Sequence, residues 1–204
     1  MSMKEAQQRM RQTYLDCLSN FADDDFRAIT WGDRYGKSAK RRYEQMDETI
    51  PFKQASVLEI GCGFGSFFKL GFQAREYHGI DVMPEMIDRA KQFQSDSVTF
   101  SVCDVSSLNL EKKDYDVAIA SGVAGNRRGP ASRPPDLCRM LFSMASHAKY
   151  TLVNFPSTWA TVRSPGIEYF DPASLLNVAL IVSPIVTIHT CTGMDTLVCI
   201  EKQV

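Results

Sequence analysis

The sequence lacks several features that would point to common classes of protein. It has only three histidines and no Cys-x-x-Cys pair among its six cysteines, so we expect no metal site. Lys and Arg total 23 against 24 Asp and Glu, and this balance disfavours binding to nucleic acid through phosphate contacts. The N-terminus has no signal-peptide run, and polar residues interrupt the uncharged stretch 172–194. We therefore expect a cytoplasmic protein with reduced cysteines and no membrane span.

The length and composition fit one domain. At 204 residues, with 44% hydrophobic and 23% charged residues, the chain can bury a sizeable core. No internal repeat, linker or low-complexity segment divides it. We expect a single domain over residues 1–204, in which residues 1–55 form a helical cover and residues 56–204 form the core.

From residue 56 the sequence alternates between strand and helix patterns. The predicted strands are 56–60, 77–81, 98–102, 115–120 and 150–154, followed by a hairpin of 185–189 and 196–200. Helices are expected at 3–21 and 38–49, and beginning near residues 66, 83, 137 and 172. Such β-α units predict an α/β fold with a doubly wound, seven-stranded, mostly parallel sheet and a C-terminal antiparallel hairpin. Ligands of these sheets bind outside the carboxyl ends of the strands.

The strongest functional signal is the turn after the first predicted strand, Gly61-Cys62-Gly63-Phe64-Gly65. Glycines allow the tight turn and let a ligand lie against bare backbone. Asp81 ends the second strand, at a distance that suits hydrogen bonds to both ribose hydroxyls of a nucleoside. Asp104 follows the third strand, where a carboxylate can accept from the adenine amino group. The apolar residues expected around the purine are Val82, Met83 and Val105.

A nicotinamide dinucleotide is a competing ligand for a glycine-rich turn. Its fingerprint is Gly-x-Gly-x-x-Gly, whereas Gly65 comes one residue early here. Glu59, two residues before Gly61, is unfavourable beside a pyrophosphate and suits a cationic amino or sulfonium group. These two features argue against a dehydrogenase.

The same residues carry a resemblance to a known family. The runs VLEIGCGFGSF, YHGIDVMPEMIDRAKQF and VTFSVCDVSSL resemble the first three motifs of class I S-adenosylmethionine (SAM)-dependent methyltransferases, over about residues 55–204. A narrower resemblance is to small bacterial-type methyltransferases with a Trp-Gly loop, here Trp31-Gly32. The resemblance implies SAM as the cofactor and in-line transfer of its methyl group to an acceptor.

The resemblance also implies roles for individual residues. Glu59 would hold the amino group of SAM, directly or through a water. Ser121 would lie near the sulfonium, and Asp81 and Asp104 would bind the ribose and the adenine. Arg42 would pair with the methionine carboxylate, or else lie on a solvated helix face. The remaining residues assigned to the cofactor are Trp31, Gly61, Gly63 and the backbone of Cys62 and Phe64.

A catalytic base is a separate question, because methyl transfer needs one only for weak or protonated nucleophiles. The narrower group carries an Arg-His-Asp-Tyr run on its penultimate strand, of which only His189 remains here. His189 is therefore the candidate catalytic residue. His78 is expected in the core and His147 at a helix end.

We expect methyl transfer to O or N of a small-molecule acceptor, because no residues remain for a separate recognition domain. Two alternatives stay open. The loop from Arg127 to Arg133 would guide an RNA or protein substrate, or the chain would be a regulatory module that binds SAM without turnover. A homodimer or a protein partner is compatible with each of these three functions.

Overall fold

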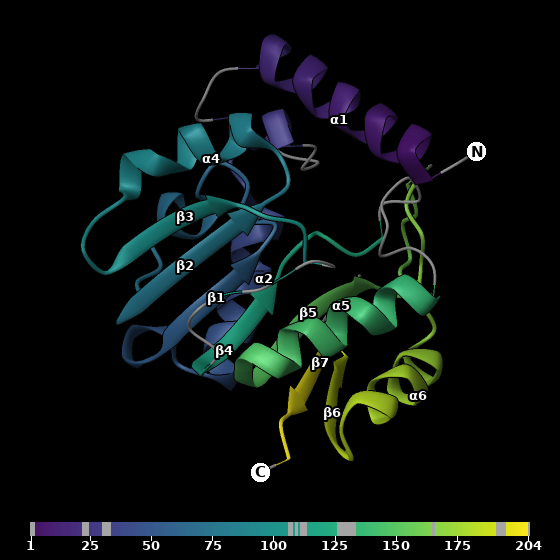
Figure 1. The fold of residues 1–204 in the computed structure, drawn as a ribbon. Helices are drawn as coiled ribbons and strands as arrows, with labels where there is room; N and C mark the ends of the chain where they lie inside the picture. Colours follow the sequence, from purple (N-terminus) through teal and green to yellow (C-terminus); the bar gives the residue numbers. More distant parts are fainter. Residues whose placement is uncertain are drawn as a thin grey trace.

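The computed structural model describes residues 3–21, 25–29, 34–105, 108, 110, 114–125, 134–164, 166–190 and 195–203. Seven strands form one sheet in the order β3-β2-β1-β4-β5-β7-β6 (Figure 1). Strands β1 to β5 are parallel, and β7 runs antiparallel to both of its neighbours. The predicted α/β fold with a C-terminal hairpin is confirmed. The strands are β1 (Ser56–Ile60), β2 (Glu76–Asp81), β3 (Val98–Val102), β4 (Tyr115–Ala120), β5 (Ala148–Pro156), β6 (Ile185–Thr190) and β7 (Asp195–Glu201).

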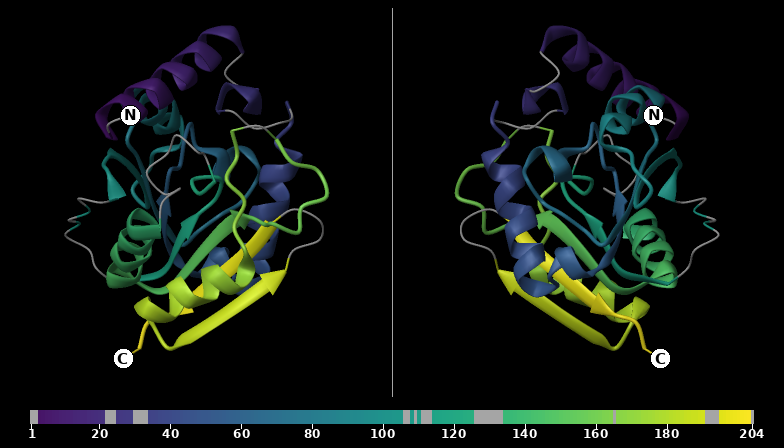
Figure 2. Two further views of the ribbon diagram at one scale, coloured as in Figure 1. Left: turned by 90° about the vertical axis from the view of Figure 1, so that its right-hand side faces the viewer. Right: turned by 90° about the vertical axis from the view of Figure 1, so that its left-hand side faces the viewer.

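Helices cover both faces of the sheet (Figure 2). On one face α2, α3 and α4 pack against β1, β2 and β3, and on the other face α5 and α6 pack against β4, β5 and β7. Within the described residues, no helix is both long enough and apolar enough to cross a membrane. The helices are α1 (Met3–Asn20), α2 (Lys37–Thr49), α3 (Ser66–Lys69), α4 (Pro84–Ala90), α5 (Pro134–His147) and α6 (Pro172–Val182), with short 3-10 helices η1 (Phe26–Ile29), η2 (Phe52–Gln54) and η3 (Lys91–Phe93).

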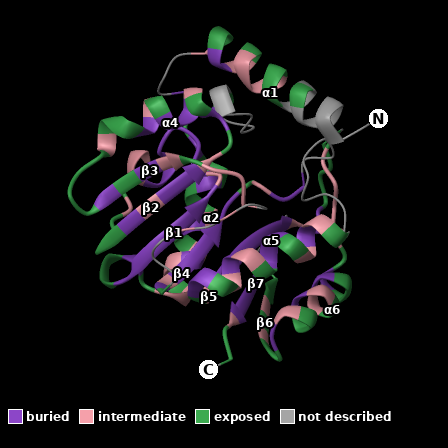
Figure 3. Ribbon diagram, viewed as in Figure 1, coloured by how far each residue is buried: buried purple, intermediate pink, exposed green. Residues whose placement is uncertain are grey.

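The central strands are buried along most of their length (Figure 3). All five residues of β1 are buried, as expected for a parallel strand that has helices on both sides. Side chains of the sheet alternate between two core groups. We call the side that contains Val57, Ile119 and Leu152 the α2 side, because Tyr43 and Met46 of α2 pack there.

The helix expected from residue 66 is only four residues long. Gly71 follows it with φ +89°, a left-handed conformation that ends helices. The amides of Gly71 and Phe72 donate back to the carbonyls of Phe68 and Phe67, which closes the last turn. Helical periodicity alone did not show this early end. The turn predicted at residues 192–193 lies outside the described residues.

The order of the strands places a switch point between β1 and β4. The chain runs outward from β1 to β3 and then returns to add β4 on the other side of β1. The N-terminal segment lies over the carboxyl ends of these strands (Figure 1). Phe26 of η1 packs on Phe64 with ring centroids 5.4 Å apart, and Arg11 of α1 donates to Glu85 of α4 at 2.5 Å. Ligands of open α/β sheets bind at such a switch point.

Asp171 directly precedes α6 and caps its first turn. Its carboxylate accepts from the Ser174 amide at 2.9 Å, and Pro172 occupies the first turn. Replacing Asp171 with alanine is expected to lower the free energy of unfolding by about 1 kcal/mol, because the cap is lost. Urea denaturation would measure it. Asp171→Asn is the control, since asparagine caps as well, and an equal loss in both variants would contradict the cap.

Candidate functional site

The glycine turn after β1 is held against the end of β2. The amides of Gly61 and Cys62 both donate to the Ile80 carbonyl, at 2.8 and 3.0 Å. Gly61, Gly63 and Gly65 have φ values of +71°, +55° and +85°, a region that favours glycine. The side chains of Cys62 and Phe64 are buried in the α2-side core, so this turn presents mainly backbone.

Asp81 joins the glycine turn to the start of α4. One carboxylate oxygen accepts from the Gly63 amide and the other from the Met83 amide, each at 3.0 Å. Burial raises the pKa of Asp81, and the backbone hydrogen bonds from Met83 and Gly63 act in the opposite direction. Gly63 and Asp81, each assigned to the cofactor from the sequence, are thus in direct contact at the carboxyl ends of β1 and β2.

The surface next to Asp81 differs in part from the predicted purine site. Val82 is 47% exposed, as a ligand-facing residue would be. Met83 is not: its side chain is buried in the α2-side core, so only its amide faces the site. Val105 packs against the opposite core group. Val102, which was not predicted, adjoins this surface, because it pairs with Asp81 and is 51% exposed.

Asp104 lies two residues beyond Val102, next to this surface. The Cys103 amide donates to the Asp81 carbonyl at 2.9 Å, which continues the β2–β3 pairing past the strand end. This pairing brings the two predicted acids to adjacent strand ends.

Glu59 has a different environment from the one predicted. Its side chain is 0% exposed, and its two oxygens accept from the hydroxyls of Tyr43, at 2.5 Å, and Tyr77. Burial raises the pKa of Glu59 to about 7, against the effect of the two tyrosine hydrogen bonds. This geometry contradicts direct contact with a ligand amino group. Glu59 instead ties α2 to the strands beneath the glycine turn.

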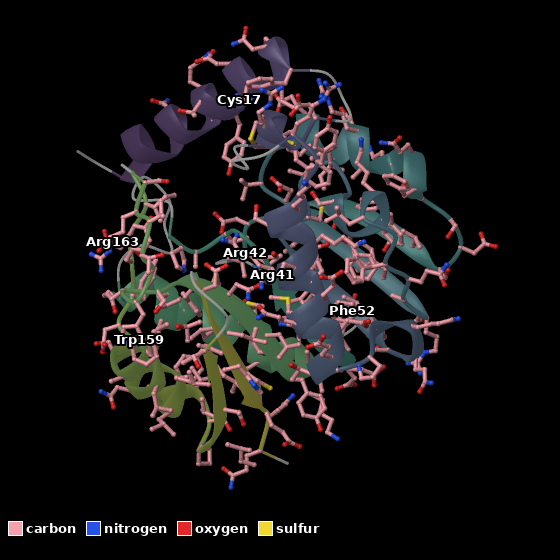
Figure 4. All side chains as sticks on the ribbon, turned by 180° about the vertical axis from the view of Figure 1, so that it is seen from behind. Cys17, Arg41, Arg42, Phe52, Trp159 and Arg163 are labelled. Carbon is pink, nitrogen blue, oxygen red and sulfur yellow. The ribbon has the colours of Figure 1, made fainter. Side chains whose placement is uncertain are left out.

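Arg42 likewise has a protein partner. Its Nε donates to one carboxylate oxygen of Asp195 at 2.5 Å, and Nη2 reaches the other at 3.2 Å. The ion pair joins α2 to the start of β7, and both side chains are largely buried. Figure 4 views this face and labels Arg42 near its centre. The solvated helix face does not describe this arrangement, and contact of Arg42 with the methionine carboxylate stays a prediction.

Ser121 directly follows β4 and lies beside the glycine turn. It is 6% exposed, and its Oγ has no hydrogen-bond partner within the described residues. Asn154 of β5 is 2% exposed, and its Oδ1 and Nδ2 likewise have no hydrogen-bond partner within the described residues. Asn154 was not predicted as a site residue. The signal for it was a polar residue inside the apolar run Leu152–Phe155.

The histidines do not gather at this site. His189 is exposed on the edge strand β6, four strands from β1 in the sheet, which is roughly 19 Å at the usual strand spacing. That distance separates His189 from the glycine turn, and its role as a base for the acceptor stays a prediction. His78 contacts Tyr115 and Ser101, and burial lowers its pKa. His147 contacts the Ser143 carbonyl at the end of α5, as predicted.

Two predicted features lie outside the described residues: Trp31 and the loop from Arg127 to Arg133. Within the described part of the chain, no group of three or more His, Cys, Asp and Glu side chains is placed to hold a metal ion.

The backbone at Gly61 leaves no room for a side chain. A Cβ there would lie 2.4 Å from Cγ2 of Val123, and φ is +71°. Gly61→Ala is therefore expected to lower the free energy of unfolding by about 2–4 kcal/mol. Thermal unfolding should show that the double variant with Val123→Ala regains the part of this stability that the clash removes. Identical values for the single and double variants would contradict the contact.

Comparison with known proteins assigns the first part of this core to a family. Residues 57–147 match a protein-family model described as a methyltransferase domain. This segment is a methyltransferase domain. It runs from β1 to the end of α5 and contains both the glycine turn and Asp81.

Relatives of the methyltransferase domain include a malonyl-[acyl-carrier protein] O-methyltransferase of Anoxybacillus flavithermus. It is 31% identical over 99 residues, which are 47% of this chain and 38% of the relative. A second enzyme of that description, from Ilyobacter polytropus, is 31% identical over 96 residues, covering 44% of this chain and 35% of the relative. The match thus spans less than two fifths of each relative.

Solved structures share the fold of the methyltransferase domain. The N-methyltransferase NodS of Bradyrhizobium japonicum has a TM-score of 0.61 at 18% identity, over 82% of this chain and 97% of NodS. Magnesium protoporphyrin IX methyltransferase of Synechocystis, solved with bound S-adenosylhomocysteine (SAH), has a TM-score of 0.58 at 17% identity, over 81% of each chain.

Proposed function

We propose that this chain transfers a methyl group from SAM to O or N of a small-molecule acceptor. The observation that carries the proposal is the contact of the Asp81 carboxylate with the glycine turn, at the switch point of a methyltransferase domain. An acid at the end of β2 and a backbone-lined turn after β1 are the groups that a nucleoside and its attached amino acid need.

The residues of the site fit SAM. Each oxygen of Asp81 accepts a backbone hydrogen bond, and the carboxylate has further lone pairs for the ribose hydroxyls. Val82 follows Asp81 in the chain and Val102 pairs with it, and their exposed side chains would give a purine apolar contact. Asp104 lies beyond Val102, where it would accept from the adenine amino group.

When bound, SAM supplies a methyl group already activated on a positively charged sulfur. The work left to the protein is to align the acceptor with that carbon and to exclude water. The glycine turn would fix the cofactor through Gly61 and Gly63. The N-terminal segment over the carboxyl ends of the strands would close the site from above.

The test is SAM-dependent transfer to acceptors of different size. Purified protein is expected to release SAH with members of a panel of small alcohols, phenols and amines, and not with RNA or protein. Salt-sensitive RNA binding together with RNA methylation would favour the polymer alternative. SAM binding without turnover on any acceptor would favour the regulatory alternative.

A further inference from the structure

Two polar side chains beside the glycine turn, Ser121 and Asn154, have hydrogen-bonding groups that nothing described in the structure satisfies. The atoms are Oγ of Ser121 and both Oδ1 and Nδ2 of Asn154, all with almost no exposed surface. Buried polar atoms without a partner cost free energy, and native proteins keep few of them. A bound group would satisfy these atoms.

The strand register places both side chains on one side of the sheet. Ala120 pairs with Val153, so the next residues along β4 and β5, Ser121 and Asn154, are neighbours. Because side chains alternate, they share the α2 side with Ile119 and Leu152, which precede them by two residues. Ile60 pairs with Ala120, so Ser121 also follows directly beside Gly61. Asn154 is therefore one strand farther from the glycine turn than Ser121.

This order separates the cofactor from the acceptor. The glycine turn and Asp81 belong to β1 and β2, whereas Asn154 belongs to β5, on the far side of β4. A methyl group held over Gly61 and Ser121 would be transferred toward a group at Asn154. The acceptor is then expected between β5 and α2.

Among the described residues, the charged side chains of Asp195, Arg42 and Glu59 lie on the same side of the sheet as Asn154, and each has a partner. Asp195 is a diagonal cross-strand neighbour, since Leu197 pairs with Asn154 and Asp195 with Pro156. Its carboxylate is paired with the Arg42 guanidinium. Both oxygens of Glu59 accept from tyrosines. These groups supply no uncompensated positive charge for an anionic acceptor, and a buried carboxylate without one is costly.

We propose that Asn154 binds the acceptor and that the acceptor group is an uncharged hydroxyl, as in an alcohol or phenol. A hydroxyl both donates and accepts, which matches Oδ1 and Nδ2 of one asparagine. The acceptor oxygen forms the new bond to the methyl carbon as the carbon–sulfur bond breaks. The electron pair of that bond stays on sulfur, and the hydroxyl proton passes to solvent. The inference rests on the proposed function and narrows its substrate class.

The variant that tests this is Asn154→Leu, with Thr151→Val as the matched control. Leucine has a similar shape to asparagine and removes both polar atoms. Thr151 is on the same strand, is 1% exposed and also has an unpartnered hydroxyl, but it faces the opposite core group with Val153. Replacing an unsatisfied buried polar group with an apolar one is expected to raise the melting temperature in both variants.

The activities should separate the two variants. Wild-type protein is expected to methylate hydroxyl acceptors and not the matched carboxylic acids, with SAH release as the readout. Asn154→Leu should lower kcat/KM for such an acceptor on the order of 30-fold. Its Kd for SAM, measured by calorimetry, should stay within about twofold of wild type. Thr151→Val should match wild type in both measurements.

Several results would overturn the inference. One is a wild-type preference for carboxylic acids, and another is no turnover of any hydroxyl acceptor while SAM binds. A third is that Asn154→Leu has the same kinetics as the control. A lower melting temperature of Asn154→Leu would also overturn it, because it would indicate a structural role of Asn154 through buried water. Loss of SAM affinity in Asn154→Leu would place the residue in the cofactor site. A wild-type protein that binds no SAM would instead refute the proposed function itself.

Discussion

Replacing Asp81 with alanine is expected to weaken SAM binding about 100-fold. The carboxylate would accept hydrogen bonds from the ribose, and hydrogen bonds to charged groups contribute about 1.5–3 kcal/mol, where about 1.4 kcal/mol corresponds to tenfold. The same carboxylate holds the amides of Gly63 and Met83 in the free protein. Its loss therefore also loosens the turn that the cofactor contacts. Calorimetry with SAM and SAH measures the effect.

Asp88→Ala is the matched control for Asp81→Ala. Asp88 lies on α4, close in sequence to Asp81, but its side chain is 71% exposed and pairs with Lys91. We expect no change in SAM affinity in this variant. Circular dichroism would confirm that both variants are folded. Equal SAM affinities for Asp81→Ala and wild type would refute the ribose assignment.

Glu59 gives the largest expected change in stability. Its two oxygens are the partners of the Tyr43 and Tyr77 hydroxyls in a fully buried site. Replacing Glu59 with alanine leaves a cavity and two buried hydroxyls without acceptors. The free energy of unfolding is expected to fall by about 3–5 kcal/mol. Urea denaturation tests this, with Glu44→Gln on the exposed side of α2 as the control, and a loss below about 1 kcal/mol would contradict the buried network.

The pH dependence of stability tests the same network with a milder variant, Glu59→Gln. Folding raises the pKa of Glu59 from 4.5 to about 7, so the folded state binds the proton more tightly than the unfolded state. The protonated carboxyl contributes fully to the free energy of unfolding below about pH 4.5, and this contribution is lost as the pH rises to about 7. Relative to Glu59→Gln, wild type should thus lose roughly 3 kcal/mol over this range. A constant difference between the two proteins would contradict the raised pKa.

The sequence predicted the strands and the carboxyl-end edge of the sheet well. The strands 56–60, 98–102 and 115–120 agree with β1, β3 and β4 residue by residue. Hydrophobic runs between turn residues are local signals, and so is a glycine turn that follows a strand. The placement of Asp81 at the end of β2 depends on the same local signals.

The partners of the site residues depend on contacts that no local signal contains. Arg42 pairs with Asp195, 153 residues later in the chain. Glu59 meets Tyr43 and Tyr77, 16 and 18 residues away, because α2 packs over the same side of the sheet. Each residue type suggested a ligand contact by itself, and the long-range packing gave each a partner within the protein.

Calorimetric titration of the wild-type protein with SAM tests the central claim most directly. We expect one-to-one binding with a micromolar Kd, and binding of SAH in the same site. We expect no heat of binding with NADH. A folded protein that binds neither SAM nor SAH at millimolar concentration, or one that binds NADH instead, would contradict a SAM site at the glycine turn.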